Sequence, residues 1–274
     1  MEKLKINLVG NSFTHITGGN LGYSVHGKKS KYVEWNFDDS LDKTFYIDNS
    51  ISSVFNSTSN SKKYAWLLES KYVASQINSD IKENYKKYLP KFEYIFTHDK
   101  DLLCLDKKFK WCPANGFWIK DAKIYPKSKM ISFISSDKNI TEGHSKRLKW
   151  VSMIGDQVDL YGRGINPIAN KEDGLCDYMF SVAIENGFYN SYFTEKILDC
   201  FATGTIPVYL GSPDIGNYFN KNGIIDLVDE FDISDEIYYN KMDAIIENLN
   251  KVKEMEILED FIYLNYLKKE KKSV

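Results

Sequence analysis

The chain has 274 residues, of which 43% are hydrophobic and 15% aromatic, so it can build one large domain or two of ordinary size. Its formal net charge of −2 argues against an overall basic surface for nucleic acid, although a local basic patch is compatible with it. No run approaches the roughly 18 apolar residues of a membrane-spanning helix, and the first residues do not resemble a secretory signal, so we expect neither.

The cysteines and histidines indicate no metal centre. Cys104, Cys112, Cys176 and Cys200 form no CxxC pair, and the 4 histidines are scattered along the chain. We therefore expect neither a zinc site nor a disulfide framework, and a reducing cytoplasm is the expected location.

The first half of the chain alternates strand and helix patterns. Short runs rich in apolar and β-branched residues predict strands at 6–9, 43–48, 64–69 and 94–97. A loop is expected over 11–20, and a helix over 77–88 that Pro90 stops. This alternation predicts a parallel sheet flanked by helices.

A second alternating series follows a segment that mixes Pro, Gly and charge. It predicts a strand at 130–134, a helix at 145–154, and strands at 158–161 and 178–184, the last apolar enough to be buried on both faces. We therefore predict an N-terminal Rossmann-like domain over 1–118, a linker over 119–128, a C-terminal Rossmann-like domain over 129–253, and a C-terminal helix with a basic tail over 254–274. A cleft between the two domains is expected.

The basic tail has two interpretations. Lysines at 268, 269, 271 and 272 indicate a solvated terminus. The alternative is a weak membrane-surface contact, because six apolar or aromatic residues precede the lysines: Phe261, Ile262, Tyr263, Leu264, Tyr266 and Leu267.

Residues 178–213 carry the chemistry. The predicted strand ends at Ile184 and presents Glu185 and Asn186 at its carboxyl end, and Thr194 is placed to cap the helix that follows. Gly204 suits the left-handed end of that helix. Ligands of open α/β sheets bind beyond the carboxyl ends of strands, beside helix N-termini.

The start of this helix suits a phosphorylated ligand. A helix N-terminus attracts phosphate, and Lys196 adds a full positive charge. Glu195 suits hydrogen bonds from a ribose or sugar hydroxyl. The alternative is that Glu195 only complements the helix dipole and Lys196 is solvated.

Three short motifs follow one another in this region: Ala183-Ile-Glu-Asn186, Tyr192-Phe-Thr-Glu-Lys196 and Ile206-Pro-Val-Tyr-Leu-Gly-Ser-Pro213. In this order they resemble the donor-binding signature of family-10 glycosyltransferases, the α1,3/4-fucosyltransferases, which reads F-E-N, then Y-x-T-E-K, then I-P-x-x-x-G-S-P, with Ile184 here in place of the phenylalanine. The similarity covers about residues 129–230 and is faint before them.

The resemblance implies a GT-B-type α/β fold, two Rossmann-like domains facing a central cleft, with the acceptor on the 1–118 side and GDP-fucose on the 129–253 side. It also implies inversion at the anomeric carbon. The residues that we expect at the donor are Arg147, Gly162, Arg163, Glu185, Asn186, Tyr192, Thr194, Glu195 and Lys196. For Arg147 the alternative is an ordinary surface cation.

Charge builds on the departing diphosphate, and Arg147 and Lys196 can stabilise it without a divalent metal. We therefore expect no tightly bound cofactor and no metal site, with a divalent ion as an optional activator. Our candidate base for the acceptor hydroxyl is Glu69, in a segment that resembles the family's E-S-P, with Lys71 in place of the proline. Asp38, Asp39 and Asp99 compete with it, and a purely structural role for Glu69 is the alternative.

The function that follows is transfer of fucose, or a related deoxysugar, from a GDP-sugar to a hydroxyl of a glycan. The family resemblance implies an α1,3 linkage to an N-acetylglucosamine-containing saccharide, and polysaccharide biosynthesis is its natural extension. Two alternatives stay open: transfer to a hydroxylated DNA base, which needs a basic trough that the acids near Lys82 and Lys86 dilute, and a non-catalytic carbohydrate-binding protein.

Overall fold

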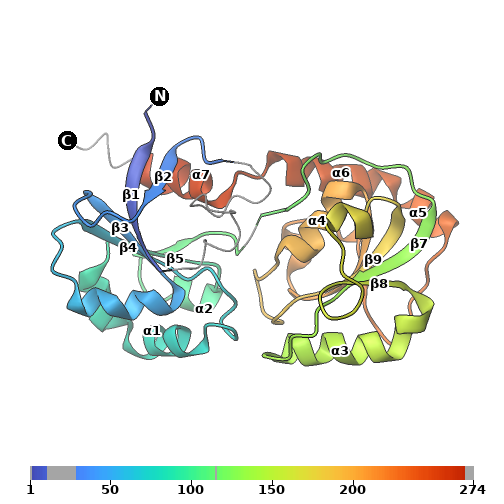
Figure 1. Ribbon diagram of the computed structural model, residues 1–274, viewed down its shortest axis with the longest axis horizontal. Helices are drawn as coiled ribbons and strands as arrows, with labels where there is room; N and C mark the ends of the chain where they lie inside the picture. The colour runs from blue at the N-terminus through green and yellow to red at the C-terminus, as the bar shows by residue number, and fades with distance from the viewer. Residues whose placement is uncertain (1, 11–28, 115, 269–274) are drawn as a thin grey trace. The chain divides into compact units, whose positions relative to one another are not determined.

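The computed structural model describes residues 2–10, 29–114 and 116–268, so the loop expected over 11–20 lies outside the described residues. The chain divides into two compact units. Unit 1 comprises Met1–Gly116 and Glu256–Val274, and unit 2 comprises Phe117–Met255 (Figure 1).

Unit 1 is built on a parallel sheet with the strand order β2-β1-β3-β4-β5-β6. Its strands are β1 (Leu4–Val9), β2 (Val33–Asn36), β3 (Lys43–Ile47), β4 (Lys62–Trp66), β5 (Tyr94–Thr97) and β6 (Phe109–Trp111), and its first helices are α1 (Ser75–Tyr88) and α2 (Lys100–Leu103). Aromatic rings from neighbouring strands stack in its core, with the ring centroids of Phe45 and Tyr64 4.9 Å apart.

The sequence reading missed both edge strands of this sheet. β2 and β6 have only 4 and 3 residues, with polar and charged side chains among the apolar ones. Such short strands carry too few residues for the period-2 pattern to stand out. Their positions follow from pairing with β1 and β5.

The C-terminal segment belongs to unit 1. Helix α7 (Leu258–Ile262) and a single π-helical turn (Tyr263–Leu267) pack against the sheet of that unit. Leu258 and Leu267 are each only 1% exposed. The buried carboxylate of Asp260 accepts hydrogen bonds from the hydroxyl of Ser30 and from the backbone N–H of Lys31.

This packing corrects one of the interpretations of the tail. The apolar residues proposed for a membrane-surface contact, 261–267, are the ones that complete the core of unit 1, and the side chains of Ile262 and Tyr263 are buried there. Ile262, Tyr263 and Leu267 are therefore not available to a lipid surface in the folded unit, whereas Phe261, Leu264 and Tyr266 are half-buried against the same core. Lysines 269, 271 and 272 lie outside the described residues.

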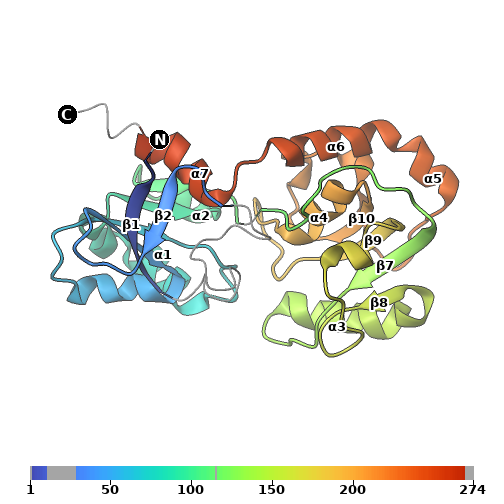
Figure 2. The ribbon, with the colours of Figure 1, turned by 45° about the horizontal axis from the view of Figure 1, so that its top comes forward.

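Unit 2 is built on a second parallel sheet with the order β11-β10-β9-β7-β8 (Figure 2). Its elements are β7 (Lys129–Ile134), α3 (Glu142–Ile154), β8 (Asp159–Tyr161), β9 (Tyr178–Ile184), α4 (Glu195–Thr203), β10 (Ile206–Leu210), β11 (Ile225–Asp226), α5 (Asp235–Asn240) and α6 (Met242–Glu254).

Residues 117–128, most of which we predicted as a linker, lie within unit 2. Ile119 is fully buried in its core. The ammonium of Lys127 donates to the carbonyl oxygens of Cys176 at 3.0 Å and Thr203 at 2.9 Å, and burial lowers its pKa to about 8. The segment therefore wraps the sheet as part of its packing.

The predicted βαβ unit is present. β9 is buried along its whole length, α4 is capped by the Thr194 side chain, and it ends at Gly204 with φ 68°, as expected. Helix α3 begins three residues earlier than we predicted. The reason is that the Thr141 side chain accepts from the backbone N–H of His144 and caps the first turn.

Among the residues that the structure describes, no helix has both the length and the apolar character needed to cross a bilayer. All four cysteines are free thiols, and two of them, Cys112 and Cys200, are buried.

The packing of α7 gives a stability prediction. Replacing Leu258 with Ala leaves a cavity in unit 1 and should lower its free energy of unfolding by about 2–5 kcal/mol, measured by urea denaturation. Glu256→Ala, at an exposed position two residues away, should stay within about 0.5 kcal/mol of the unchanged chain. Equal effects of the two substitutions would show that α7 does not contribute to the core.

Candidate functional site

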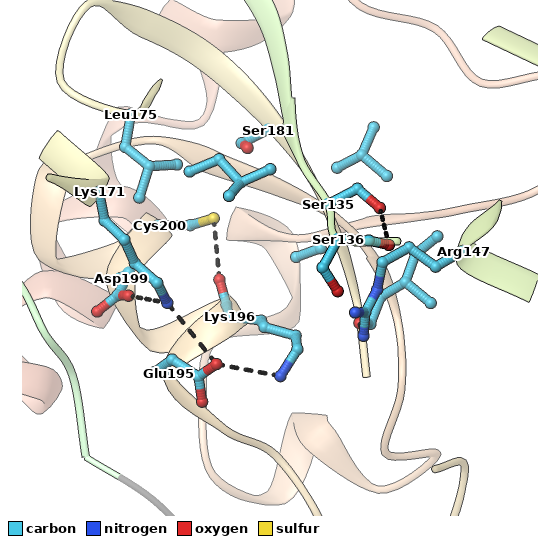
Figure 3. Close-up of a pocket in the computed structure, with 14 residues that line it drawn as sticks. Ser135, Ser136, Arg147, Lys171, Leu175, Ser181, Glu195, Lys196, Asp199 and Cys200 are labelled. Atoms are coloured by element: carbon cyan, nitrogen blue, oxygen red, sulfur yellow. Dashed lines mark hydrogen bonds and ion pairs between the residues drawn. The ribbon is translucent and has the colours of Figure 1, made fainter. Parts of the chain in front are cut away.

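A cavity of about 170 Å³ opens at the carboxyl ends of β7 and β9, beside the first turn of α4. Its lining includes the ionisable side chains of Arg147, Lys171, Glu195, Lys196 and Asp199. Figure 3 shows Lys171, Glu195 and Lys196 grouped on one side and Arg147 on the other. The sequence had indicated this end of the sheet, and the structure brings Arg147, Glu195 and Lys196 together there.

Arg147 is buried under the cavity wall. Its side chain extends from α3, is 6% exposed, and donates from Nη2 to the carbonyl oxygen of Ile184 at 2.9 Å and to Oδ1 of Asn186 at 2.8 Å. Helix α3 lies so close to the end of β9 that a Cβ at Gly143 would stand 2.2 Å from the carbonyl oxygen of Glu185. Asn186 therefore orients the guanidinium that borders the cavity.

Glu185 lies behind the cavity. It is fully buried, and its carboxylate accepts from the backbone N–H of Thr194 at 2.8 Å and from the Thr194 hydroxyl at 2.7 Å. Burial raises its pKa, against the opposing effect of Lys196, whose Nζ lies 3.6 Å away. Glu185 thus holds the start of α4 in place, a role different from the direct donor contact that the sequence suggested.

The first turn of α4 presents an acid and a base side by side. Lys196 Nζ lies 3.1 Å from Oε1 of Glu195 and 3.0 Å from the hydroxyl of Thr194. Burial alone would raise the pKa of Glu195, but Lys196 and Lys171 hold it well below its ordinary value. Glu195 is therefore ionised at neutral pH and acts as a hydrogen-bond acceptor.

Sequence reasoning missed Lys171 and Asp199. Lys171 Nζ lies 2.7 Å from Oδ2 of Asp199, and burial raises the pKa of Asp199 to about 6. A signal was present: Asp199 stands in the apolar stretch of α4, four residues after Glu195, and therefore on the same helix face. A charge buried at such a position needs a partner of opposite charge.

Other predicted donor residues lie around the cavity without lining it. Gly162 has φ 125°, and a Cβ there would stand 1.5 Å from the carbonyl oxygen of Ser135, so only glycine allows this close approach of two loops. Arg163 is exposed in the same loop. Tyr192 is 2% exposed and stacks on Tyr189 at a centroid distance of 4.7 Å.

The loop before α4 is tied to the segment after β10. The backbone N–H of Ser191, which has φ 67°, donates to Oδ1 of Asp214 at 2.7 Å. The hydroxyl of Tyr218 donates to the hydroxyl of Ser191 at 2.7 Å. A Cβ at Gly211 would stand 2.1 Å from the Tyr209 hydroxyl, which explains the glycine before Ser212 and Pro213.

The candidate base, Glu69, is exposed in unit 1, three residues beyond β4. Its backbone N–H donates to Oδ1 of Asp48 at 3.1 Å. Of its competitors, Asp38 and Asp39 are also exposed, and Asp99 is 6% exposed and paired with Lys71 at 3.2 Å. An exposed carboxylate can meet an acceptor, whereas the Asp99 carboxylate is occupied by its lysine.

No group of three or more His, Cys, Asp or Glu residues within 2–10, 29–114 and 116–268 is arranged to hold a metal ion. The charges that face the cavity are those of Arg147, Lys171, Lys196, Glu195 and Asp199.

Comparison of the whole chain with solved structures gives its fold class. A crystal structure of an α1,3-fucosyltransferase matches with a TM-score of 0.54 and 15% identity, over 98% of this chain and 89% of that one. A crystal structure of α1,3-fucosyltransferase with GDP-fucose matches with a TM-score of 0.51, also at 15% identity, over 98% of this chain and 90% of that one. The two parallel sheets therefore belong to a GT-B-like fold.

The sequence of unit 2 is similar to a glycosyltransferase family. Residues 124–257 match the model of "Glycosyltransferase family 10 (fucosyltransferase) C-term". The α-(1,3)-fucosyltransferase FucT of Helicobacter pylori is 35% identical over 74 residues, 27% of this chain and 16% of that protein. GDP-fucose protein O-fucosyltransferase 3 of Homo sapiens is 32% identical over 104 residues, 32% of this chain and 22% of that protein. The chain thus aligns with about a fifth of the length of these relatives.

The buried imidazole of His144, on α3, predicts acid sensitivity. Its Nδ1 accepts from the backbone N–H of Thr141 at 3.2 Å, and burial, helped by the nearby Arg147, lowers its pKa from 6.5 to about 4. The unfolded chain takes up this proton first, so stability present above pH 6.5 is lost as the pH falls towards 4. The loss from this group should reach about 3 kcal/mol.

Urea denaturation between pH 4 and 7 measures this dependence, with His144→Asn as the comparison, because its amide oxygen can accept the same hydrogen bond without titrating. The variant should lose less stability over this interval. His98 in unit 1 titrates in the same direction, its pKa lowered by burial to about 3, so the difference between the two proteins isolates His144. Parallel pH profiles would refute the assignment.

Proposed function

We propose that this chain is an inverting glycosyltransferase that transfers fucose, or a related deoxysugar, from a GDP-sugar to a hydroxyl of a glycan acceptor. The observation that carries the proposal is the pair of cations, Arg147 and Lys196, at one cavity beside the N-terminus of α4, in the part of the chain that matches the family-10 model. Relatives with GDP-fucose in their names support the choice of donor.

The positive charges of Arg147 and Lys196 suit the diphosphate of the donor. A diphosphate diester carries two negative charges, and its departure as GDP adds charge to the leaving oxygen. Arg147 and Lys196 supply full positive charges, and the first backbone N–H groups of α4 add the positive end of the helix dipole. These groups are positioned before the reaction begins, which is the condition for electrostatic stabilisation of a transition state. A divalent ion is then an optional activator.

The carboxylate of Glu195 suits the sugar. It is held ionised by two lysines and lines the same cavity, so it can accept hydrogen bonds from ribose or fucose hydroxyls.

The reaction has a defined balance of bonds. The acceptor oxygen forms a bond to the anomeric carbon as the bond from that carbon to the phosphate oxygen breaks, and the electron pair leaves with GDP. The transition state resembles the oxocarbenium ion of glycoside hydrolysis. We propose that Glu69 takes the proton of the acceptor hydroxyl.

Two kinds of acceptor are suggested by the names of the relatives. The name of the Helicobacter pylori relative supports an α1,3 linkage, for which we propose an N-acetylglucosamine-containing saccharide, within polysaccharide biosynthesis in the cytoplasm. The second candidate is a hydroxyl of a polypeptide, which is favoured by the relatives named protein O-fucosyltransferases. Parallel assays with an N-acetylglucosamine-containing disaccharide and with a Ser/Thr peptide distinguish the two.

The donor is tested by calorimetric titration with GDP-fucose, GDP, UDP-glucose and UDP. The chain should prefer the guanosine compounds, and Lys196→Met should weaken both of them about 10–100-fold, since a charged hydrogen-bond donor to phosphate is lost. Lys149→Met, which removes an exposed cation of α3, is the matched control and should have no effect. A preference for UDP compounds, or equal behaviour of both variants, contradicts the proposed donor.

The base is tested by Glu69→Gln. This variant should lower kcat about 10²–10⁴-fold while leaving the Kd of GDP-fucose unchanged, because a general base acts on the acceptor and not on the donor. Glu83→Gln, at an exposed position of α1, is the control. If Glu69→Gln retains full kcat, the base lies elsewhere.

A further inference from the structure

Lys171 is a second lysine at the Glu195 carboxylate, and it belongs to none of the motifs discussed above. It begins the short 3-10 helix η5 (Lys171–Gly174), lines the cavity, and places Nζ 3.7 Å from Oε1 of Glu195. Lys196 contacts the same oxygen from within α4 at 3.1 Å. The carboxylate is therefore held by two lysines that come from different elements (Figure 3).

Lys171 is itself firmly anchored. Its Nζ lies 2.7 Å from Oδ2 of Asp199, whose side chain is 1% exposed. The other oxygen of Asp199 accepts from the backbone N–H of Trp118 at 2.5 Å, and the Lys171 ammonium lies 4.6 Å from the centroid of the Trp118 ring. A lysine fixed by a buried carboxylate and an aromatic face loses little further freedom when a ligand binds.

The ammonium of Lys196 has three carboxylate or hydroxyl oxygens as partners, whereas that of Lys171 has two. Its Nζ is shared among the hydroxyl of Thr194, Oε1 of Glu195 and Oε2 of Glu185, at distances of 3.0, 3.1 and 3.6 Å. A bound diphosphate would add stronger acceptors to this set. Without Lys171, the Glu195 carboxylate would then keep its hydrogen bond with the Thr194 side chain but would lose the restraint of both lysines at the moment when the sugar must be recognised.

We propose that Lys171 is a positioning residue for the donor sugar: it keeps the Glu195 carboxylate oriented toward the sugar hydroxyls while Lys196 turns to the diphosphate. This inference rests on the proposed function. It separates two tasks that the short motif combines, charge balance at the phosphates by Lys196 and alignment of the sugar-binding carboxylate by Lys171.

The test compares the Kd of GDP-fucose with the Kd of GDP for the unchanged chain, Lys171→Met, Lys171→Arg and, as a control, the exposed Lys120→Met. Lys171→Met should weaken GDP-fucose about 10-fold and GDP less than about threefold, because only GDP-fucose carries the fucose hydroxyls toward which Lys171 is proposed to orient Glu195. Lys171→Arg should restore the preference for GDP-fucose, and Lys120→Met should keep it. A purely structural role would lower the melting temperature and weaken both ligands equally, which would overturn the inference.

A double variant covers the case in which Lys171→Met fails to fold because Asp199 is left buried without a cation. Lys171→Met with Asp199→Asn removes both charges and keeps an amide oxygen for the Trp118 N–H. It should show the same selective loss of GDP-fucose, and an unaltered ratio of the two Kd values would overturn the inference. If the unchanged chain binds neither GDP nor GDP-fucose, the proposed function itself fails, an outcome distinct from an unaltered ratio.

Discussion

The site depends on the two hydrogen bonds that the buried carboxylate of Glu185 accepts from the backbone N–H and the hydroxyl of Thr194. These two hydrogen bonds join the end of the central strand β9 to the first turn of α4. They fix where the helix begins and hence where its free N–H groups point. Burying a carboxylate costs free energy unless it is hydrogen-bonded. The end of β9 and the start of α4 therefore have to be in place at the same time. The charged groups at the cavity are then placed around this junction, Glu195, Lys196 and Asp199 from α4, Arg147 from α3 and Lys171 from η5.

The sequence predicts an element best where its local residue pattern and its packing in the folded unit favour the same structure. The continuous apolar run of β9, the cap at Thr194 and the glycine at 204 each have a local cause, and the structure confirms all three. The edge strands β2 and β6 could not be predicted because their identity comes from partners distant in sequence. The segment 119–128 looked like a linker for a related reason: its polar residues obscure Ile119, whose burial is decided by unit 2 as a whole.

Within the site, residue type was easier to predict than residue role. Arg147, Glu195 and Lys196 line the cavity, whereas Glu185 turns away from it and stabilises the helix start. A sequence gives the end of a strand but not the direction in which an acid at that end turns. The Lys171 and Asp199 pair was missed because its members are 28 residues apart and each has an ordinary local context. An acidic residue within an apolar stretch of a helix, such as Asp199, indicates a partner of opposite charge elsewhere in the chain.

The return of residues 256–267 to unit 1 has a consequence for how the chain acquires its structure. Unit 2 is one continuous stretch of sequence, while unit 1 is assembled from two stretches that unit 2 separates. During synthesis, the second sheet can therefore close before the first core is complete, because Leu258 and Leu267 emerge from the ribosome after all of unit 2. Until then, unit 1 exposes the apolar face that α7 later covers. The core of the earlier-encoded unit is thus completed only by residues that are synthesised after the whole of the later-encoded one.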